Sequence, residues 1–235
     1  MFRAKQDSDS YWPSISDLMS GLMLVFLLIA IAYMQHIEKT RESARRAAVA
    51  YQETQIKLYD ALMDEFRNDL SKWGASIDPK TLSVKFDEPD VLFSSGSSDI
   101  PLAFRRILDD FFPRYLNILF SPRFKESIKE IRIEGHTSSG WDNGRASEDI
   151  AYFENMGLSQ SRTRAVLQYC YGLTSTAQQK TLMRKNVTAN GLSSSHTISD
   201  EKTGLEDPIK SRRVEFRTIT DAEQKIVEIL RELGK

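Results

Sequence analysis

An uncharged apolar run near the N-terminus constrains this chain more than any other feature of its sequence. The segment Leu18–Met34 carries no charged side chain and consists mostly of Leu, Ile, Met, Val and Phe. Together with the residues just before it, the segment reaches the length of about 20 residues that a helix needs to cross a membrane. Trp12 and Tyr33 suit the two membrane interfaces. The sequence therefore predicts a transmembrane helix over residues 12–34, after a polar tail over residues 1–11.

Two other interpretations of the apolar run stay open at this level. The first is a cleaved signal peptide, which fits the basic residues Arg3 and Lys5 and the processing-site pattern Ala30-Ile31-Ala32. Acidic residues such as Asp7 and Asp17 count against it. The second is the core helix of a soluble domain, although such a helix is usually apolar on one side only.

Composition narrows the classes of function. With 32 Lys and Arg against 33 Asp and Glu, the chain has no basic excess, so we expect no nucleic-acid partner. The one cysteine, Cys170, allows no disulfide within the chain, and we expect it to be a buried side chain of a helix. The three histidines are far apart in the sequence. We therefore expect no metal site, no cofactor and no catalytic constellation, and the chain is not expected to be an enzyme.

The chain beyond the apolar run predicts a stalk and then an α/β domain. Residues 35–73 hold no glycine or proline and predict a helical stalk. Ile37, Ala44, Tyr51 and Leu58 recur every seven residues, as in a helix pair, and a solvated single helix is the alternative.

The segment 74–79, rich in turn-forming residues, ends this helix, and a domain over residues 80–220 follows. Alternating apolar residues predict strands, and amphipathic segments predict helices, including one from Ser159 as N-cap to Leu173. Residues 221–235 predict a C-terminal amphipathic helix. The expected fold class is one transmembrane helix, a helical stalk and an α/β sandwich. Strands are expected at residues 82–86, 128–134, 187–192 and 212–218. Helices are expected at residues 101–119, 159–173 and 174–185.

Asp17 is the acidic residue nearest the apolar run. A carboxylate inside a spanning helix costs roughly 2.5 to 3.5 kcal/mol at the bilayer centre, so such a group is usually retained for a function. A carboxylate that alternates between charged and neutral forms is a natural ion carrier. The alternative is structural: Ser14-Ile15-Ser16-Asp17 fits a capping box, in which the carboxylate only stabilises the start of the helix.

The segment Trp12–Met23 resembles the start of the MotB family of motor stator subunits, which has an aromatic residue, a short polar stretch and then Asp-Leu/Phe-Met-Ser/Thr. In that family the Asp carries protons or sodium ions, and two such helices stand inside a ring of A-subunits. The resemblance implies that Asp17 translocates an ion, expected to be a proton, with Ser16 and Ser20 as neighbours in the ion site. It also implies a homodimer and a ring-forming A-subunit as partner.

A second resemblance, to the OmpA-like family, covers residues 80–220. Four segments carry it in the family's order: Val91–Pro101 with its Phe-x-x-Gly, Ile131–Thr137 ending in Gly-His-Thr, Asn155–Val166 with Leu-Ser-x-x-Arg, and Ser211–Phe216. The family is a small β/α domain that binds the peptide stem of peptidoglycan. Its members hold the diaminopimelate with an Asp after the Gly-His-Thr and with the Arg of the Leu-Ser-x-x-Arg turn.

Carried over, this resemblance implies a peptidoglycan site made by Arg162, Thr137, Ser138 and Asp142. Ser138 stands where the family has its Asp, and Asp142 or Asp149, in an insertion, could supply the missing carboxylate. Each residue has a structural alternative. Arg162 could make a surface salt bridge.

The residues next to this site have structural explanations too. We expect His136 to stabilise a turn. Arg212 and Arg213 could pair with Glu residues of the sheet instead of contacting a ligand.

Together, the two segments resemble the B-subunits of Zorya anti-phage defence systems more than those of flagellar stators, because the stalk follows the span almost directly. This implies a single-pass protein of the bacterial inner membrane with a cytoplasmic N-terminus and a periplasmic C-terminal domain. The excess of Lys and Arg after the span, at Lys39, Arg41, Arg45 and Arg46, would by itself favour the opposite orientation. The alternatives are a flagellar-type stator subunit, a cell-wall anchor that conducts no ion, and a signal-cleaved periplasmic protein.

Overall fold

A computed structural model describes residues 11–87 and 89–221 of the chain. The described part of the chain divides into two units, one up to residue 49 and the other from residue 50 onward. The predicted C-terminal helix over residues 221–235 lies outside the described residues except for Asp221. Each unit is described by itself.

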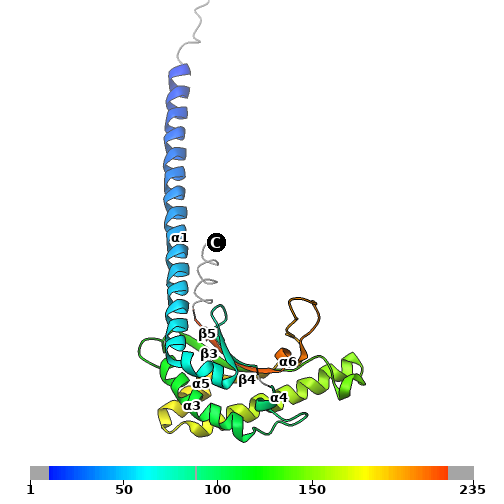
Figure 1. Ribbon diagram of the computed structural model, residues 1–235. Helices are drawn as coiled ribbons and strands as arrows, with labels where there is room; N and C mark the ends of the chain where they lie inside the picture. The colour runs from blue at the N-terminus through cyan, green and yellow to red at the C-terminus, as the bar shows by residue number, and fades with distance from the viewer. Residues whose placement is uncertain (1–10, 88, 222–235) are drawn as a thin grey trace, which may run out of the picture. The chain divides into compact units, whose positions relative to one another are not determined.

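A single helix, α1 (Tyr11–Leu70), carries the apolar run and continues far beyond it (Figure 1). Its segment Ile15–Arg46 is long and apolar enough to span a membrane, and none of its most apolar window is buried within the chain. The alternative of a buried core helix is therefore wrong. Residues 12–34 and 35–70 form one unbroken helix because no glycine or proline interrupts helix formers after Gly21.

The C-terminal turns of α1 belong to the second unit. Leu58, Leu62 and Phe66 recur every four residues on one side of the helix and are fully buried. Leu58, the last member of the seven-residue repeat, thus packs into the core of its own domain. The helix tightens into a short 3-10 turn, Ser71–Trp73, and stops at Gly74, whose φ of 57° suits glycine.

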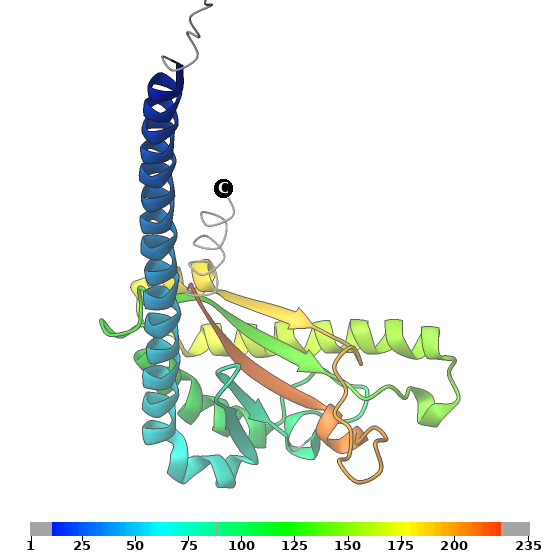
Figure 2. The same ribbon diagram turned by 90° about the horizontal axis from the view of Figure 1, so that it is seen from above.

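Five strands form one mixed sheet in the order β1-β2-β5-β3-β4. Strands β3 and β4 are parallel and the other pairs are antiparallel. Figure 2 shows β4, β3 and β5 side by side, with α4 running along them. The strands are β1 (Ala75–Asp78), β2 (Ser83–Phe86), β3 (Ile128–His136), β4 (Val187–Gly191) and β5 (Arg213–Thr220).

Helices cover one face of this sheet. Helix α3 (Leu102–Leu119) packs its aromatic side chains against the sheet. The ring of Phe111 is central to this packing. Its centroid lies 5.3 Å from that of Phe66 of α1, 5.2 Å from that of Phe86 of β2 and 5.1 Å from that of Phe216 of β5. This cluster joins the end of α1 to the sheet. The helices of the domain are α2 (Pro89–Leu92), α3 (Leu102–Leu119), α4 (Glu148–Leu173), α5 (Ala177–Asn186) and α6 (Pro208–Ser211).

Two sequence predictions need correction. Helix α4 begins at Glu148 with Ser147 as its N-cap, so the prediction of Ser159 as N-cap is wrong, and Ser159 is buried inside the helix. The segment 74–79 does end a helix, but it also contains strand β1, which the sequence did not indicate.

In agreement with the prediction, Cys170 is fully buried in α4, and burial raises the pKa of its thiol well above the usual value.

Candidate functional site

A cavity of about 500 Å³ opens at the carboxyl end of β3. Its lining comes from the end of β3, the loop that follows, the middle of α4, the turn after α2 and the segment around α6. All four residues predicted for the peptidoglycan site, Arg162, Thr137, Ser138 and Asp142, line this one cavity. The structure thus brings together residues that are 25 positions apart in the sequence.

Close packing of α4 against the sheet forms one wall of this cavity. Gly135 of β3 and Gly191 of β4 are neighbours in the parallel pair, and both face α4. A Cβ atom at Gly135 would lie 2.6 Å from Cγ2 of Thr163. The absence of side chains at these two positions lets the helix approach and sets the position of Arg162 beside the end of β3.

Arg162 is held by backbone carbonyls. Its Nε donates to the carbonyl oxygen of Ser97 at 2.9 Å and its Nη2 to that of Ser94 at 3.0 Å, while the guanidinium lies 4.8 Å from the ring centroid of Phe93. These bonds go to carbonyls rather than to the carboxylate that a surface salt bridge would need. Burial, and then the charge of Arg212, lowers the pKa of Arg162 to about 10, so the group is cationic at neutral pH.

The end of β3 presents Thr137 and Ser138 to the cavity. The amide of Thr137 donates to the carbonyl oxygen of Ser193 at 2.9 Å, and its buried hydroxyl has no hydrogen-bond partner among the described residues. Asn155 of α4 fixes the loop by donating to the carbonyl oxygens of Ser138 at 3.1 Å and Gly140 at 3.2 Å. Asn155 belongs to the segment that resembles the OmpA-like family, yet the sequence alone gave it no role.

Asp142 is the acidic residue that lines the cavity, whereas Asp149 lies in the first turn of α4 and does not. Asp142 begins the short 3-10 helix Asp142–Gly144, is exposed, and has a φ of 47°. Of the two carboxylates that could replace the one missing at Ser138, only Asp142 is therefore near Arg162. A cation-binding carboxylate and a guanidinium in one cavity can hold the two ends of a zwitterion.

Arg212 and Arg213 have different surroundings although they are neighbours in sequence. Nε of Arg213 donates to Oε1 of Glu215 at 2.6 Å, as the alternative of pairing with the sheet predicted. Arg212 lines the cavity, and its buried Nε has no hydrogen-bond partner in the described part of the chain. Arg213 also lines the cavity, but its Nε is bonded to Glu215, so the two alternatives left open for this pair separate: Arg213 pairs with the sheet, and Arg212 offers its Nε to the cavity.

Asp17 lies in the second turn of the described part of α1, and its side chain is exposed. The described helix already includes Tyr11, so the Ser-x-x-Asp pattern lies inside it, which argues against a capping box. The hydroxyl of Ser20 donates to the carbonyl oxygen of Ser16 at 2.8 Å, along the helix axis. The cavity and Asp17 belong to the two separate units.

Comparisons with known proteins agree with these features. No protein-family model matches the sequence. The chain is 50% identical to the Zorya protein ZorB of Escherichia coli (strain Crooks) over 229 residues, covering 97% of this chain and 96% of that protein. It is 25% identical to the Zorya protein ZorB of Escherichia coli O139:H28, covering 92% of this chain and 82% of that protein.

Two solved structures are similar at lower identity. A MotB-like protein from Desulfovibrio vulgaris has a TM-score of 0.49 at 22% identity, covering 72% of this chain and 96% of that one. The periplasmic domain of Helicobacter pylori MotB (residues 78–256) has a TM-score of 0.42 at 18% identity, covering 63% and 83% of the two chains.

A helix that is long and apolar enough to cross a membrane, followed by an α/β domain with an arginine-lined cavity, is the architecture of a membrane protein with a domain outside the bilayer. The identity over nearly the whole length then specifies the family. The chain belongs to the ZorB family of Zorya proteins, as the resemblance in the sequence predicted.

Proposed function

We propose that this chain is the B-subunit of an ion-driven rotary motor in the inner membrane that acts in Zorya anti-phage defence. The observation that carries the proposal is the identity to ZorB, which extends through both the apolar helix and the C-terminal domain. The proposed assembly is a homodimer inside a ring of A-subunits. The N-terminus is cytoplasmic in this proposal, and the C-terminal domain is periplasmic and anchored to peptidoglycan.

The exposure of α1 supports a protein partner in the membrane. Asp17 and its helical neighbours are exposed in the isolated chain. Because a charged group facing lipid is costly, intramembrane carboxylates face other protein or water. A second copy and a ring of A-subunits would supply that environment, and Asp17 would alternate between the ionised form and the ion-bound form as the ion passes.

Ser16 and Ser20 are the proposed neighbours of the ion. The hydroxyl hydrogen of Ser20 is used on the carbonyl oxygen of Ser16, which leaves lone pairs of the hydroxyl oxygen for an ion. In this proposal the two serines shape the site, while Asp17 alone changes its charge.

The test of ion carriage is Asp17→Asn, which keeps the shape of the side chain and removes the ionisable group. We expect phage protection to be lost while the protein level and co-purification with the A-subunit stay as in the wild type. Glu38→Gln is the matched control, because Glu38 is an exposed acid of the same helix beyond the apolar run, and it should protect normally. Full protection by Asp17→Asn would overturn ion carriage and favour a non-conducting anchor.

The cavity supports the proposed attachment to the cell wall. Arg162 and Arg212 supply positive charge for a carboxylate, and Asp142 would receive an ammonium group, as a diaminopimelate stem requires. Thr137 and Ser138 offer polar groups between them. The departure at Ser138 is thus compensated, in this proposal, by a carboxylate from the following loop.

The wall site is tested by sedimentation of the purified protein with peptidoglycan sacculi. We expect Arg162→Gln and Asp142→Asn each to raise the apparent Kd for sacculi by about tenfold or more, because each removes a charge-assisted contact of about 1.5–3 kcal/mol. Arg164→Gln, an exposed arginine on the same helix, is the control and should bind normally. If Arg162→Gln and Asp142→Asn bind sacculi as tightly as the wild-type protein does, the cavity does not hold the wall.

A further inference from the structure

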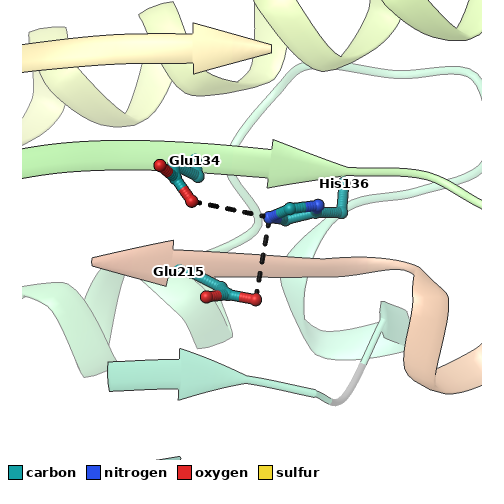
Figure 3. A group of neighbouring side chains, drawn as sticks. All are labelled: Glu134, His136 and Glu215. Atoms are coloured by element: carbon teal, nitrogen blue, oxygen red, sulfur yellow. Dashed lines mark ion pairs between the residues drawn. The ribbon is translucent and has the colours of Figure 1, made fainter. Parts of the chain in front are cut away.

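Three potential metal ligands meet on the polar face of the sheet (Figure 3). Glu134 and His136 are two residues apart on β3 and therefore share a face of the sheet. Glu215 of β5 is the cross-strand partner of Glu134 and points to the same side. The antiparallel register thus joins residues that are about 80 positions apart in the sequence.

The spacing of the three side chains suits a single ion. Nε2 of His136 lies 3.6 Å from Oε1 of Glu215 and 3.9 Å from Oε2 of Glu134, and all the ligand atoms lie within 4.8 Å of one another. Ligand atoms at about 2.1 Å from a tetrahedral Zn²⁺ are roughly 3.4 Å apart. Small side-chain adjustments would therefore bring the three atoms to bonding distance of one ion.

The imidazole is buried and lacks partners. The side chain of His136 is 3% exposed and those of the two glutamates are 8% exposed. Neither ring nitrogen of His136 has a hydrogen-bond partner among the described residues, and 3.6 Å is too long for one. Two glutamate side chains thus face this buried ring nitrogen.

Several cations border the cluster, and one of them already bonds a proposed ligand. Arg213 donates to Glu215, Lys85 is the register partner of Glu215 on β2, Arg132 and Arg217 flank Glu134, and the ring of His196 lies 6.2 Å from that of His136. An ion that takes over Oε1 of Glu215 leaves Arg213 with the carbonyl oxygens of His196 at 3.1 Å and Ser211 at 3.2 Å. The guanidinium therefore stays hydrogen-bonded.

We propose that Glu134, His136 and Glu215 form a binding site for one Zn²⁺ ion that joins β3 to β5. One imidazole and two carboxylates suit Zn²⁺ better than Ca²⁺, which takes six to eight oxygen ligands. His136 also lines the cavity, so the ion would fix the strand end from which Thr137 and Ser138 reach it. Sequence analysis predicted no metal site because it considered histidines and cysteines, whereas two of these ligands are glutamates.

The test uses the full chain, purified in detergent without a polyhistidine tag, stripped with EDTA and then titrated with Zn²⁺. Metal analysis after gel filtration should find about one Zn²⁺ per chain, with a higher temperature of unfolding. Glu134→Gln and His136→Ala should each lose the bound ion and the thermal shift. The control is His196→Ala, a neighbouring histidine outside the cluster, which should retain both.

A second measurement does not depend on the folding of any variant. Co²⁺ added to the stripped wild-type protein should give the visible absorption of a low-coordinate site, and Zn²⁺ should abolish that absorption. Absence of these bands, or Zn²⁺ binding by Glu134→Gln and His136→Ala equal to that of the wild type, would overturn the proposal. Both measurements are made on the purified chain, so their outcome is independent of phage protection and of wall binding.

Discussion

At the scale of single residues, the two glycines beneath α4 decide how the cavity is built. Gly191→Ala places a Cβ against the backbone of Gln160, at 2.6 Å from its Cα and closer still to its amide nitrogen. We expect the substitution to destabilise the domain by about 1–3 kcal/mol, because backbone on both sides must move. Urea unfolding followed by tryptophan fluorescence measures the change.

Gly157→Ala is the matched control on α4. A Cβ there meets nothing within 4 Å, and alanine is the better helix former, so the domain should become about 0.5–1 kcal/mol more stable. Equal effects of the two substitutions would mean that close packing at Gly191 does not matter.

Single residues also show where sequence reasoning succeeded. Arg162, Thr137 and Ser138 came from short motifs and do line one cavity, because each motif ends or begins an element that the fold brings to the same place. Asn155 could not be assigned in this way, and for Arg212 the sequence left ligand contact and pairing with the sheet both open. Whether an arginine faces a cavity or a strand neighbour depends on the backbone geometry around α6, which has no signature in the sequence.

At the scale of elements, the end of α1 acts as a core helix of the domain. Leu62→Ala should lower the free energy of unfolding by about 2–5 kcal/mol, because Leu62 is fully buried and its removal leaves a cavity. Ile56→Ala on the same helix is the control: Ile56 is 52% exposed, and the change should stay within about 0.5 kcal/mol. Thermal unfolding of the detergent-purified chain distinguishes the two, and a small effect at Leu62 would contradict this packing.

The helix also shows the limit of periodicity. A run without glycine or proline correctly predicted a helix from the membrane segment toward residue 70, and the seven-residue repeat suggested a helix pair. Leu58 satisfies both that repeat and the four-residue spacing of the buried stripe. The stripe's partner is the aromatic cluster around Phe111, which a local pattern cannot indicate.

At the scale of the whole molecule, the proposed homodimer predicts contacts between two copies of the apolar helix. Single cysteines introduced in turn at each position from Leu22 to Leu28 should form disulfide-linked dimers in membranes under mild oxidation. The yield should peak at every third or fourth position, following the helical repeat.

The wild-type chain is the built-in control for this experiment. Its native Cys170 is fully buried, and burial raises the pKa of its thiol, so it should give no dimer. A low and uniform yield along the helix would argue against a helix pair at this depth of the membrane.

The sequence by itself determined the apolar span, the acid at its start, the alternation of strands and helices, and the family. These follow from local composition and short motifs, which need no knowledge of distant contacts. Only the tertiary structure decided that Asp142 and not Asp149 lines the cavity, that Arg212 joins Arg162, and that Glu134, His136 and Glu215 meet. The reason is physical: strand register and helix packing set these distances, and both depend on contacts between residues far apart in the chain.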